Sequence, residues 1–353
     1  MIPLLAEHIA IAPASEDAAR AARERVDQLT KPLGSLGRLE DLAVRLCAIA
    51  GVATLTTYEQ RAILVGAADH GVTEAGVSAY PREVTAQMVG GFLGGSAAIC
   101  ALARSARAEV WVANFGVDAD FAAHPRLIDV PIGRGTRNFA AGGAMSAAEA
   151  EAALLAGANA VEVIDPERRL QLIGLGEMGI GNTTSAAAII CALTGAAAEE
   201  IVGRGTGADD GMLARKIRIV SAAAARCNPH DWCSIATEVG GFEIVGLAGA
   251  MLAAASRSIP IVLDGFIVAA AALLARAVNP LVIDYCIASH CSRERGHGIA
   301  LDALGLTPLF DLHLRLGEAS GAALAIPIIE AAARMYSEMK TFAEAGVATK
   351  LAE

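Results

Sequence analysis

The sequence contains few aromatic residues, few charged residues and no excess of basic ones. Only 4% of its 353 residues are Phe, Trp or Tyr, only 19% are charged, and the net charge is −10. Nucleic-acid binding uses basic surfaces and aromatic rings that stack on bases, so this composition argues against a nucleic-acid partner. The chain is instead rich in Ala, Gly and aliphatic residues. Such small, apolar side chains predict helices packed closely against a sheet, not disorder.

The chain also lacks the patterns of a membrane helix, a secretory signal and a disulfide framework. The longest apolar run, 259–275, contains Asp264 near its centre and is better explained by a buried strand followed by a helix. The N-terminus has no basic region, and Glu7 and His8 interrupt its apolar residues. Seven cysteines without a short repeating spacing indicate free thiols in a reducing compartment. We therefore expect a cytoplasmic protein with no membrane partner.

From about residue 61 onward, short apolar runs alternate with Ala-rich segments. Strands that alternate with helices form βαβ units, whose right-handed crossovers produce a largely parallel sheet. The predicted fold class is therefore α/β, a Rossmann-like, mostly parallel sheet with flanking helices. The runs expected to form strands are 62–67, 110–114, 160–164, 170–173, 259–263 and 281–286.

Both ends of the chain have helical patterns. Residues 1–50 are rich in Ala, Arg and Glu, with a break at 31–38, and the pattern turns helical again towards the C-terminus. Because chain termini often lie close together, we expect these ends to pack on one another. The predicted organisation is a small helical domain formed by residues 1–50 with 305–353, and a parallel α/β domain of residues 51–304.

The most informative motif is the glycine-rich stretch 174–181, which follows a buried apolar run and precedes Asn-Thr-Thr and an Ala/Ile run. This order predicts a strand end, an open turn and a helix N-terminus, where free N–H groups and the helix dipole bind anions. Its G-x-G-x-x-G spacing matches the dinucleotide fingerprint, with Glu199 or Glu200 placed for a ribose contact. The acidic Glu177 and the additional Gly181 favour a mononucleotide or sugar-phosphate site instead. A tight turn without a ligand is the third interpretation.

The loop 203–210 contains three glycines that would allow a ligand to approach the backbone closely. Arg204 and Lys216 could neutralise a phosphate group there. The alternative is a surface loop capped by Asp209 or Asp210.

Two acidic residues follow expected strands at their carboxyl ends, where ligands bind in open α/β sheets. Asp69, in Asp-His-Gly, is expected at the edge of the site, unless it only caps the next turn. Asp264, in Asp-Gly-Phe with Gly265, is expected to hold ribose hydroxyls, unless it caps the helix that follows.

The segment 289–292, Ser-His-Cys-Ser, and the nearby His297 contain residue types that bind metals. Their spacing matches no common zinc site, and no C-x-x-C pair accompanies them. Polar ligand contacts from Ser289 or His290 fit better, and we expect no metal.

Glu318 lies between Gly317 and Gly321, close to the apolar residues Leu314 and Leu316. The glycines leave its carboxylate room to project into a cavity, where burial would raise its pKa and suit it to general-base catalysis near neutral pH. The alternative is a carboxylate that only interacts with a helix N-terminus.

Taken together, these segments resemble the nicotinate-nucleotide–dimethylbenzimidazole phosphoribosyltransferases, over almost the whole chain. The family resemblance implies a homodimer without a cofactor that converts nicotinate mononucleotide and 5,6-dimethylbenzimidazole to α-ribazole 5′-phosphate and nicotinate. The resemblance is carried by eight ordered blocks: KPLGSLGRLEDLA (31–43), ADHGV (68–72), YPREVTAQMV (80–89), GEMGIGNTTSAAA (176–188), VGGFEIVG (239–246), VLDGF (262–266), SHCS (289–292) and RLGEASGAALA (315–325).

By position, the resemblance implies that Glu318 is the general base and Glu177 the second active-site carboxylate. Residues of the base-binding pocket are expected at Tyr80, Gln87, Met88 and Leu316. Phosphate and ribose contacts are expected from Gly179, Ile180, Gly181, Asn182, Thr183, Gly203, Gly205, Lys216, Asp264, Gly265, Ser289 and Ser292.

This chemistry accounts for the residue types. The attacking imidazole loses its ring proton to Glu318 as its other nitrogen bonds to C1′, and C1′ inverts from β to α. Nicotinate leaves as a neutral pyridine, so no pyrophosphate requires a metal. Glu177 could stabilise either oxocarbenium-like charge or a protonated base. Three other functions stay open: transfer to another benzimidazole, adenine or a phenol; an NAD-dependent oxidoreductase that uses 174–179; and a binding subunit without activity.

Overall fold

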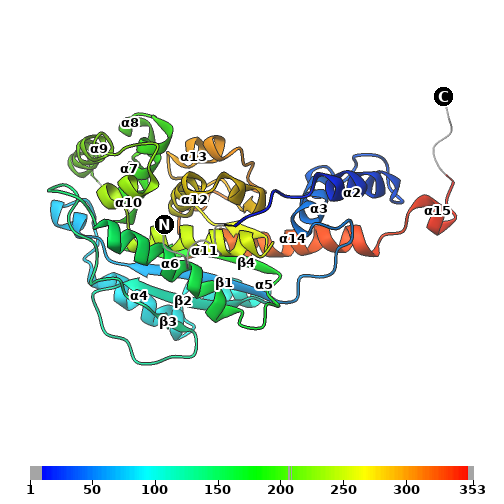
Figure 1. Cartoon of the computed structure of the whole chain (residues 1–353), viewed down its shortest axis with the longest axis horizontal. Coiled ribbons are helices and arrows are strands. Elements are labelled where there is room, and N and C mark those ends of the chain that lie inside the picture. Colours follow the sequence, from blue (N-terminus) through cyan, green and yellow to red (C-terminus); the bar gives the residue numbers. More distant parts are fainter. Residues whose placement is uncertain (1–9, 206, 208, 349–353) are drawn as a thin grey trace.

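The centre of the protein is a six-stranded parallel sheet with helices on both faces (Figure 1). The computed structural model describes residues 10–205, 207 and 209–348. The predicted parallel α/β class is confirmed, and the strand order β3-β2-β1-β4-β5-β6 is that of a doubly wound sheet. The strands are β1 (Arg61–Ala68), β2 (Glu109–Gly116), β3 (Leu127–Asp129), β4 (Leu172–Met178), β5 (Ile261–Leu263) and β6 (Cys286–Ala288).

Both faces of the sheet are buried, because alternate strand residues point to opposite sides. In β1, Leu64 and Ala68 join one apolar cluster, whereas Ile63 and Val65 join the other. The first cluster is completed mainly by α6 (Ala147–Ile164), α7 (Asn182–Thr194), α8 (Ala198–Ile201), α9 (Asp210–Ala224), α10 (Trp232–Val239), α11 (Phe242–Ser256), α12 (Phe266–Val278) and α13 (His297–Leu304). The second is completed mainly by α2 (Glu16–Gln28), α3 (Arg38–Ala50), α4 (Glu83–Leu93), α5 (Ala98–Ala106) and α14 (Ser320–Glu338).

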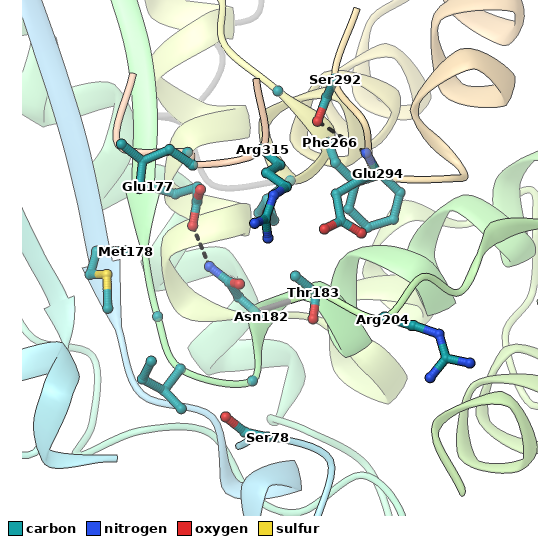
Figure 2. Close-up of a pocket in the computed structure, with 18 of the residues that line it drawn as sticks. Ser78, Glu177, Met178, Asn182, Thr183, Arg204, Phe266, Ser292, Glu294 and Arg315 are labelled. Atoms are coloured by element: carbon teal, nitrogen blue, oxygen red, sulfur yellow. Dashed lines mark hydrogen bonds between the residues drawn. The ribbon is translucent and has the colours of Figure 1, made fainter. Parts of the chain in front are cut away.

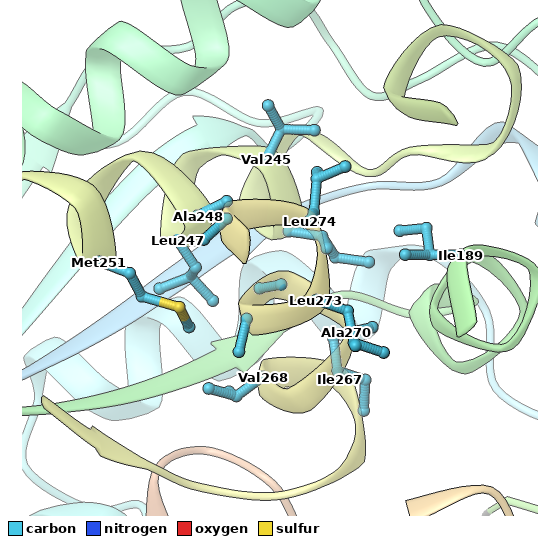
Figure 3. Packing of buried hydrophobic residues seen from close by; sticks show 14 of the residues in the cluster. Ile189, Val245, Leu247, Ala248, Met251, Ile267, Val268, Ala270, Leu273 and Leu274 are labelled. Atoms are coloured by element: carbon cyan, nitrogen blue, oxygen red, sulfur yellow. The ribbon is translucent and has the colours of Figure 1, made fainter. Parts of the chain in front are cut away.

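Small residues allow these helices to approach closely, as the composition predicts. A Cβ atom added to Gly157 of α6 would lie 1.6 Å from the carbonyl oxygen of Gly246 in α11. The run 259–275 is confirmed as β5 followed by α12, and its residues are buried. Figure 3 shows how α7, α11 and α12 contribute aliphatic side chains to one cluster.

Two of the expected strands are wrong. Residues 160–164 form the last turn of α6, because a capping box at Ser146 and Glu149 starts a helix that the Ala-rich sequence continues without a break. Most of 281–286 is a 3-10 helix, η2 (Pro280–Tyr285), and only Cys286 belongs to a strand. Proline near the first helical position favours that turn. The short strand β3 was not predicted.

The helical ends of the chain pack together, as expected. Helix α3 packs on α14, and Leu29 pairs with Thr341 just before the short helix α15 (Phe342–Ala345). The Arg25 guanidinium donates to the Met339 carbonyl at 3.2 Å. Helix α14 also lies on β4 and β5, so it links these terminal helices to the sheet. The division into two domains stays a proposal, and residues 1–9 and 349–353 lie outside the described residues.

Within the described residues, one segment, Glu83–Ala106, is long and apolar enough to cross a membrane by length and composition alone. It is divided into α4 and α5 by a turn in which Gly95 has φ +75°. Each of the two helices is therefore too short to span a bilayer.

Candidate active site

A cavity opens outside the carboxyl ends of β1 and β4, which lie side by side in the middle of the sheet (Figure 2). The chain leaves β1 towards β2 on one side and β4 towards β5 on the other. Such a reversal of strand order is where doubly wound sheets bind ligands.

Two thirds of the expected site residues line this cavity. They are Glu177, Gly179, Ile180, Gly181, Asn182, Thr183, Gly205, Lys216, Gly265, Ser292, Leu316 and Glu318. The structure does not place Gly203, Asp264, Ser289, Tyr80, Gln87 or Met88 in its lining. The sequence analysis missed Val77, Ser78, Ala79, Met178, Met212, Phe266, Ile267, Glu294, Arg315 and Gly317, and left Arg204 and His290 among its alternatives.

The turn from β4 into α7 has the geometry of an anion site. Gly181 precedes α7 with φ +97°, and no side chain caps the helix there. A Cβ atom on Gly181 would lie 2.7 Å from Thr73, so the turn needs glycine for both space and backbone conformation. The positive end of a 13-residue helix therefore faces the cavity.

Basic side chains surround this turn. Lys216 of α9 is buried, and its ammonium donates to Thr183 Oγ1 at 3.0 Å. Burial lowers the pKa of Lys216, while Glu294 raises it. Burial raises the pKa of Glu294, whereas Lys216 and Arg315 lower it. Arg204 also lines the cavity, but the predicted role of the 203–210 loop in ligand binding stays untested. The capping alternative is confirmed for Asp209, which caps α9 by accepting from Met212 N at 2.7 Å.

Glu177 lies on strand β4, and the expectation that it sits in the turn is wrong. The strand continues through Gly174 and Gly176 to Met178, so the apparent dinucleotide fingerprint is mostly strand. Figure 2 shows Glu177 pointing towards Asn182, whose side-chain amide donates to it. Burial raises the pKa of Glu177 to about 8, with further increases from Asp264, Glu243 and Glu318. The hydrogen bond from Asn182 lowers this pKa, but burial outweighs it.

The strand glycines serve packing. A Cβ atom at Gly176 would lie 2.1 Å from Ala319 N, whereas one at Gly174 would lie 3.3 Å from the side chains of Ala322 and Ile63. These positions bring the segment around residue 319 directly against β4. The sequence alone gives no signal that separates this use from a phosphate-binding turn.

Gly176→Ala is therefore expected to lower the free energy of unfolding by about 1–3 kcal/mol, as overpacking does. The matched variant Gly174→Ala, on the same face of the same strand, is expected to stay within about 1 kcal/mol of the wild type. Urea unfolding of the two variants checks this difference. Equal stabilities would contradict the packing role of Gly176.

Glu318 projects into the cavity from the loop before α14, as predicted. Its residue is 6% exposed, and Oε2 has no hydrogen-bond partner. Burial raises the pKa of Glu318. The alternative, a carboxylate bound to the helix N-terminus, is wrong for this residue because Asp264 takes that place.

Asp264 does not cap α12, the helix that follows it, and it does not line the cavity. Helix α12 begins after Gly265 without a side-chain cap, so the capping alternative is wrong. Both carboxylate oxygens instead accept N–H groups at the start of α14. Burial raises the pKa of Asp264 to about 7, although these N–H groups lower it. Its predicted contact with ribose stays untested.

Three of the four expected base-binding residues lie outside the cavity lining. Tyr80 is 48% exposed and Gln87 is exposed on α4, while Met88 packs beside the apolar cluster of that face. The residues of this segment that do line the cavity are 77–79, directly before Tyr80. Leu316 does line the cavity.

A buried acid–histidine pair lies next to the turn from β4 into α7. His70 Nε2 and Glu243 Oε1 are 2.6 Å apart, and both side chains are fully buried. A Cβ atom on Gly179 would lie 2.9 Å from Glu243 Oε1 and 3.2 Å from the His70 ring. Asp69 accepts from Asp118 N at 2.8 Å, so it holds a neighbouring loop. The sequence pointed to Asp69 and His70 but not to Glu243.

The 289–292 segment serves the scaffold as well as the cavity. Ser289 is fully buried and donates to the Asp264 carbonyl at 3.1 Å, while Ser292 N donates to His297 Nδ1 at 2.9 Å. Burial lowers the pKa of His297 to about 3. Among the described residues, no group of three or more His, Cys, Asp or Glu side chains could hold a metal ion.

A doubly wound sheet, a helix N-terminus flanked by cations, and two buried carboxyl groups facing one cavity define an enzyme that acts on a phosphorylated ligand. The comparisons with known proteins specify which one. A family model described as phosphoribosyltransferase matches residues 11–347.

Curated relatives that share one name match nearly the whole chain. The nicotinate-nucleotide–dimethylbenzimidazole phosphoribosyltransferase of Chloroflexus aggregans is 49% identical over 343 residues, 96% of each chain, and that of a Roseiflexus species is 49% identical over 352 residues, 99% of each. The crystal structure of CobT from Thermus thermophilus superposes with a TM-score of 0.91 at 47% identity, covering 95% of this chain and all of the other. The chain belongs to the nicotinate-nucleotide–dimethylbenzimidazole phosphoribosyltransferase family.

Proposed function

We propose that this phosphoribosyltransferase moves the phosphoribosyl group of nicotinate mononucleotide to 5,6-dimethylbenzimidazole, releasing nicotinate. The observation that carries the proposal is the convergence of Glu177 and Glu318 on one cavity beside an anion-binding turn. The names of the relatives supply the two substrates.

The phosphate group would bind at the Gly179–Thr183 turn, where the α7 dipole, Lys216 and Arg315 supply positive potential. The phosphate then acts as a handle that orients C1′ towards the acceptor base. Glu318 would accept the ring proton of the attacking imidazole. Attack opposite the departing nicotinate inverts C1′ and yields the α-nucleotide.

Glu177 would stabilise positive charge at C1′ or on the pyridinium ring of the substrate. Burial and the neighbouring acids raise the pKa of its carboxyl to about 8. A cationic ring in the cavity would favour the ionised form.

Lys216→Met is expected to raise KM for nicotinate mononucleotide at least about tenfold with little change in kcat, because a buried charge-assisted contact to phosphate is lost. Arg218→Met is the matched control, since Arg218 is an exposed cation on the same helix. Steady-state kinetics of both variants test the assignment. An unchanged KM for Lys216→Met would remove Lys216 from the phosphate site.

We further propose a homodimer in the cytoplasm. Leu33 and Leu312 are 74% and 60% exposed on two loops that Arg38 links by donating to the Thr307 and Pro308 carbonyls. The homodimer is what the family resemblance implies, and an interface at these loops would cover both leucines. All seven cysteines are free, which fits a reducing compartment. Sedimentation equilibrium would test the dimer.

The choice of acceptor base and the oxidoreductase alternative are both testable. The position of Gly174 and Gly176 within β4 weakens the dinucleotide interpretation, because neither glycine is available to a pyrophosphate. Chromatography of a mixture of nicotinate mononucleotide and dimethylbenzimidazole is expected to show nicotinate and α-ribazole 5′-phosphate in equal amounts. Samples with adenine or a phenol rank the acceptors. If no base releases nicotinate, the proposed function is wrong.

A further inference from the structure

We propose that Asp264 is a positioning residue for Glu318. Its carboxylate ties down the start of α14 and so holds residues 317–319 in the left-handed backbone conformation that aims the Glu318 side chain into the cavity. The inference rests on the proposed function, in which Glu318 is the general base.

The hydrogen bonds that the Asp264 side chain accepts all come from the segment that carries Glu318. Asp264 Oδ2 accepts from Ala319 N at 3.0 Å, and Oδ1 accepts from Gly321 N at 2.7 Å and from Ala322 N at 3.3 Å. Asp264 is 1% exposed, and it follows β5 directly, so it is fixed to the sheet. The carboxylate therefore ties the α14 N-terminus to the carboxyl end of β5.

The backbone in this segment needs such a restraint. Glu318 and Ala319 are consecutive residues with φ +60° and +65°, after Gly317 at φ +86°. The left-handed conformation is unfavourable for residues with a Cβ atom and persists only where surrounding contacts impose it. A carboxylate that accepts several backbone N–H groups at a helix N-terminus provides strong, charge-assisted contacts of this kind.

The Glu318 side chain has little else to orient it at its buried end. Its Oε2 atom is buried without a hydrogen-bond partner, so the direction of the carboxylate follows from the backbone that carries it. A general base must lie within hydrogen-bond reach of the proton that it accepts. Loss of the Asp264 contacts would let residues 317–319 relax and would move the base out of reach.

The Gly321 position shows how closely the two segments fit. A Cβ atom there would lie 2.9 Å from Asp264 Oδ1 and 1.9 Å from His290 Nδ1. His290 Nδ1 itself lies 3.9 Å from Asp264 Oδ1 and 2.9 Å from Ser289 Oγ. The glycine thus allows the carboxylate to reach the helix amides from the side of β5.

The test is a double-mutant cycle of Asp264→Asn and Glu318→Gln, measured as kcat, KM and equilibrium binding of nicotinate mononucleotide. Asp264→Asn alone is expected to lower kcat at least about tenfold with mononucleotide binding within about threefold, because the base moves while the substrate site is kept. In the Glu318→Gln background, Asp264→Asn is expected to lower kcat by less than about twofold, since the residue through which it acts is absent.

Asp231→Asn is the matched control. Asp231 caps α10 by accepting from Cys233 N at 2.9 Å, and it is not part of the cavity lining. Asp264→Ser runs in parallel as a smaller uncharged substitution. Amide hydrogen exchange of the wild type requires no variant: the amides of Ala319, Gly321 and Ala322 are expected to be protected as strongly as the middle of α14.

Each opposite result overturns the inference. Rapid exchange at the three amides would show that Asp264 does not hold this segment. A raised KM for the mononucleotide with normal kcat, or losses that multiply across the cycle, would assign Asp264 to a direct ribose contact. If Glu318→Gln alone leaves kcat unchanged, the proposed role of Glu318 fails instead, and the two failures are distinguished.

Discussion

Glu318→Gln is expected to lower kcat at least about 100-fold while the affinity for nicotinate mononucleotide stays within about threefold. The substitution keeps the size of the side chain but removes the carboxylate that is proposed to accept the imidazole proton. The turn proposed to bind phosphate, Gly179–Thr183, is formed by other residues, so binding of the mononucleotide is expected to be preserved. Steady-state kinetics combined with calorimetric binding measure the two quantities separately.

The pH dependence of kcat provides a second test of the role of Glu318. Burial raises the pKa of Glu318, and only its ionised form can accept a proton, so kcat falls as the pH drops below that raised pKa. Glu318→Gln should lose this dependence along with the rate. Glu338→Gln, an exposed change at the far end of α14, serves as the control. A normal kcat for Glu318→Gln would exclude Glu318 as the base.

Glu243→Ala is expected to lower the free energy of unfolding by about 3–5 kcal/mol, because it removes one partner of a buried pair. His70 and Glu243 are both fully buried, and the variant leaves the histidine in an apolar environment without its partner. The pair packs directly against Gly179 in the turn that is proposed to bind phosphate. KM for the mononucleotide is therefore also expected to rise. Urea unfolding measures the stability change.

The double variant His70→Ala/Glu243→Ala distinguishes the interaction between the two side chains from the packing of each one against its neighbours. If the loss comes from an unpaired buried group, the double variant is less destabilised than the sum of the two single variants. Additive losses would mean that each side chain acts through packing alone. Glu344→Ala on α15 provides an exposed control of the same residue type.

The sheet was predictable because strands that are buried on both faces consist of short, nearly continuous runs of apolar residues. The runs that became β1, β2, β4 and β5 are of this kind. The run 160–164 is equally apolar, but its Ala-rich neighbours continue the helix that begins after Ser146. Periodicity alone does not separate a buried strand from the end of a buried helix.

The site was predictable where its residues lie next to a strand end, as Glu177 and Gly181 do. Residues such as Ser78 and Arg315 reach the cavity from loops that no local pattern marks as close to β4. The position of Asp264 after a strand was predictable, but its hydrogen-bond partners were not. They lie at the N-terminus of α14, more than 50 residues further along the chain. Hydrogen bonds of this range are decided by the tertiary fold.

The close fit of α14 against Gly176 makes the sheet depend on a segment that is synthesised late. All six strands of the sheet end by Ala288, whereas Arg315, Leu316, Gly317 and Glu318 of the cavity lining come after it. Glu318 lies in about the last tenth of the sequence, on the segment that enters the groove left by the strand glycines. Because the apolar residues of α14 belong to the second cluster and the helix lies on β4 and β5, a chain that stops short of α14 would leave that face of the sheet uncovered. The last tenth of the sequence is therefore expected to be needed for the sheet to fold as well as for the cavity to be complete.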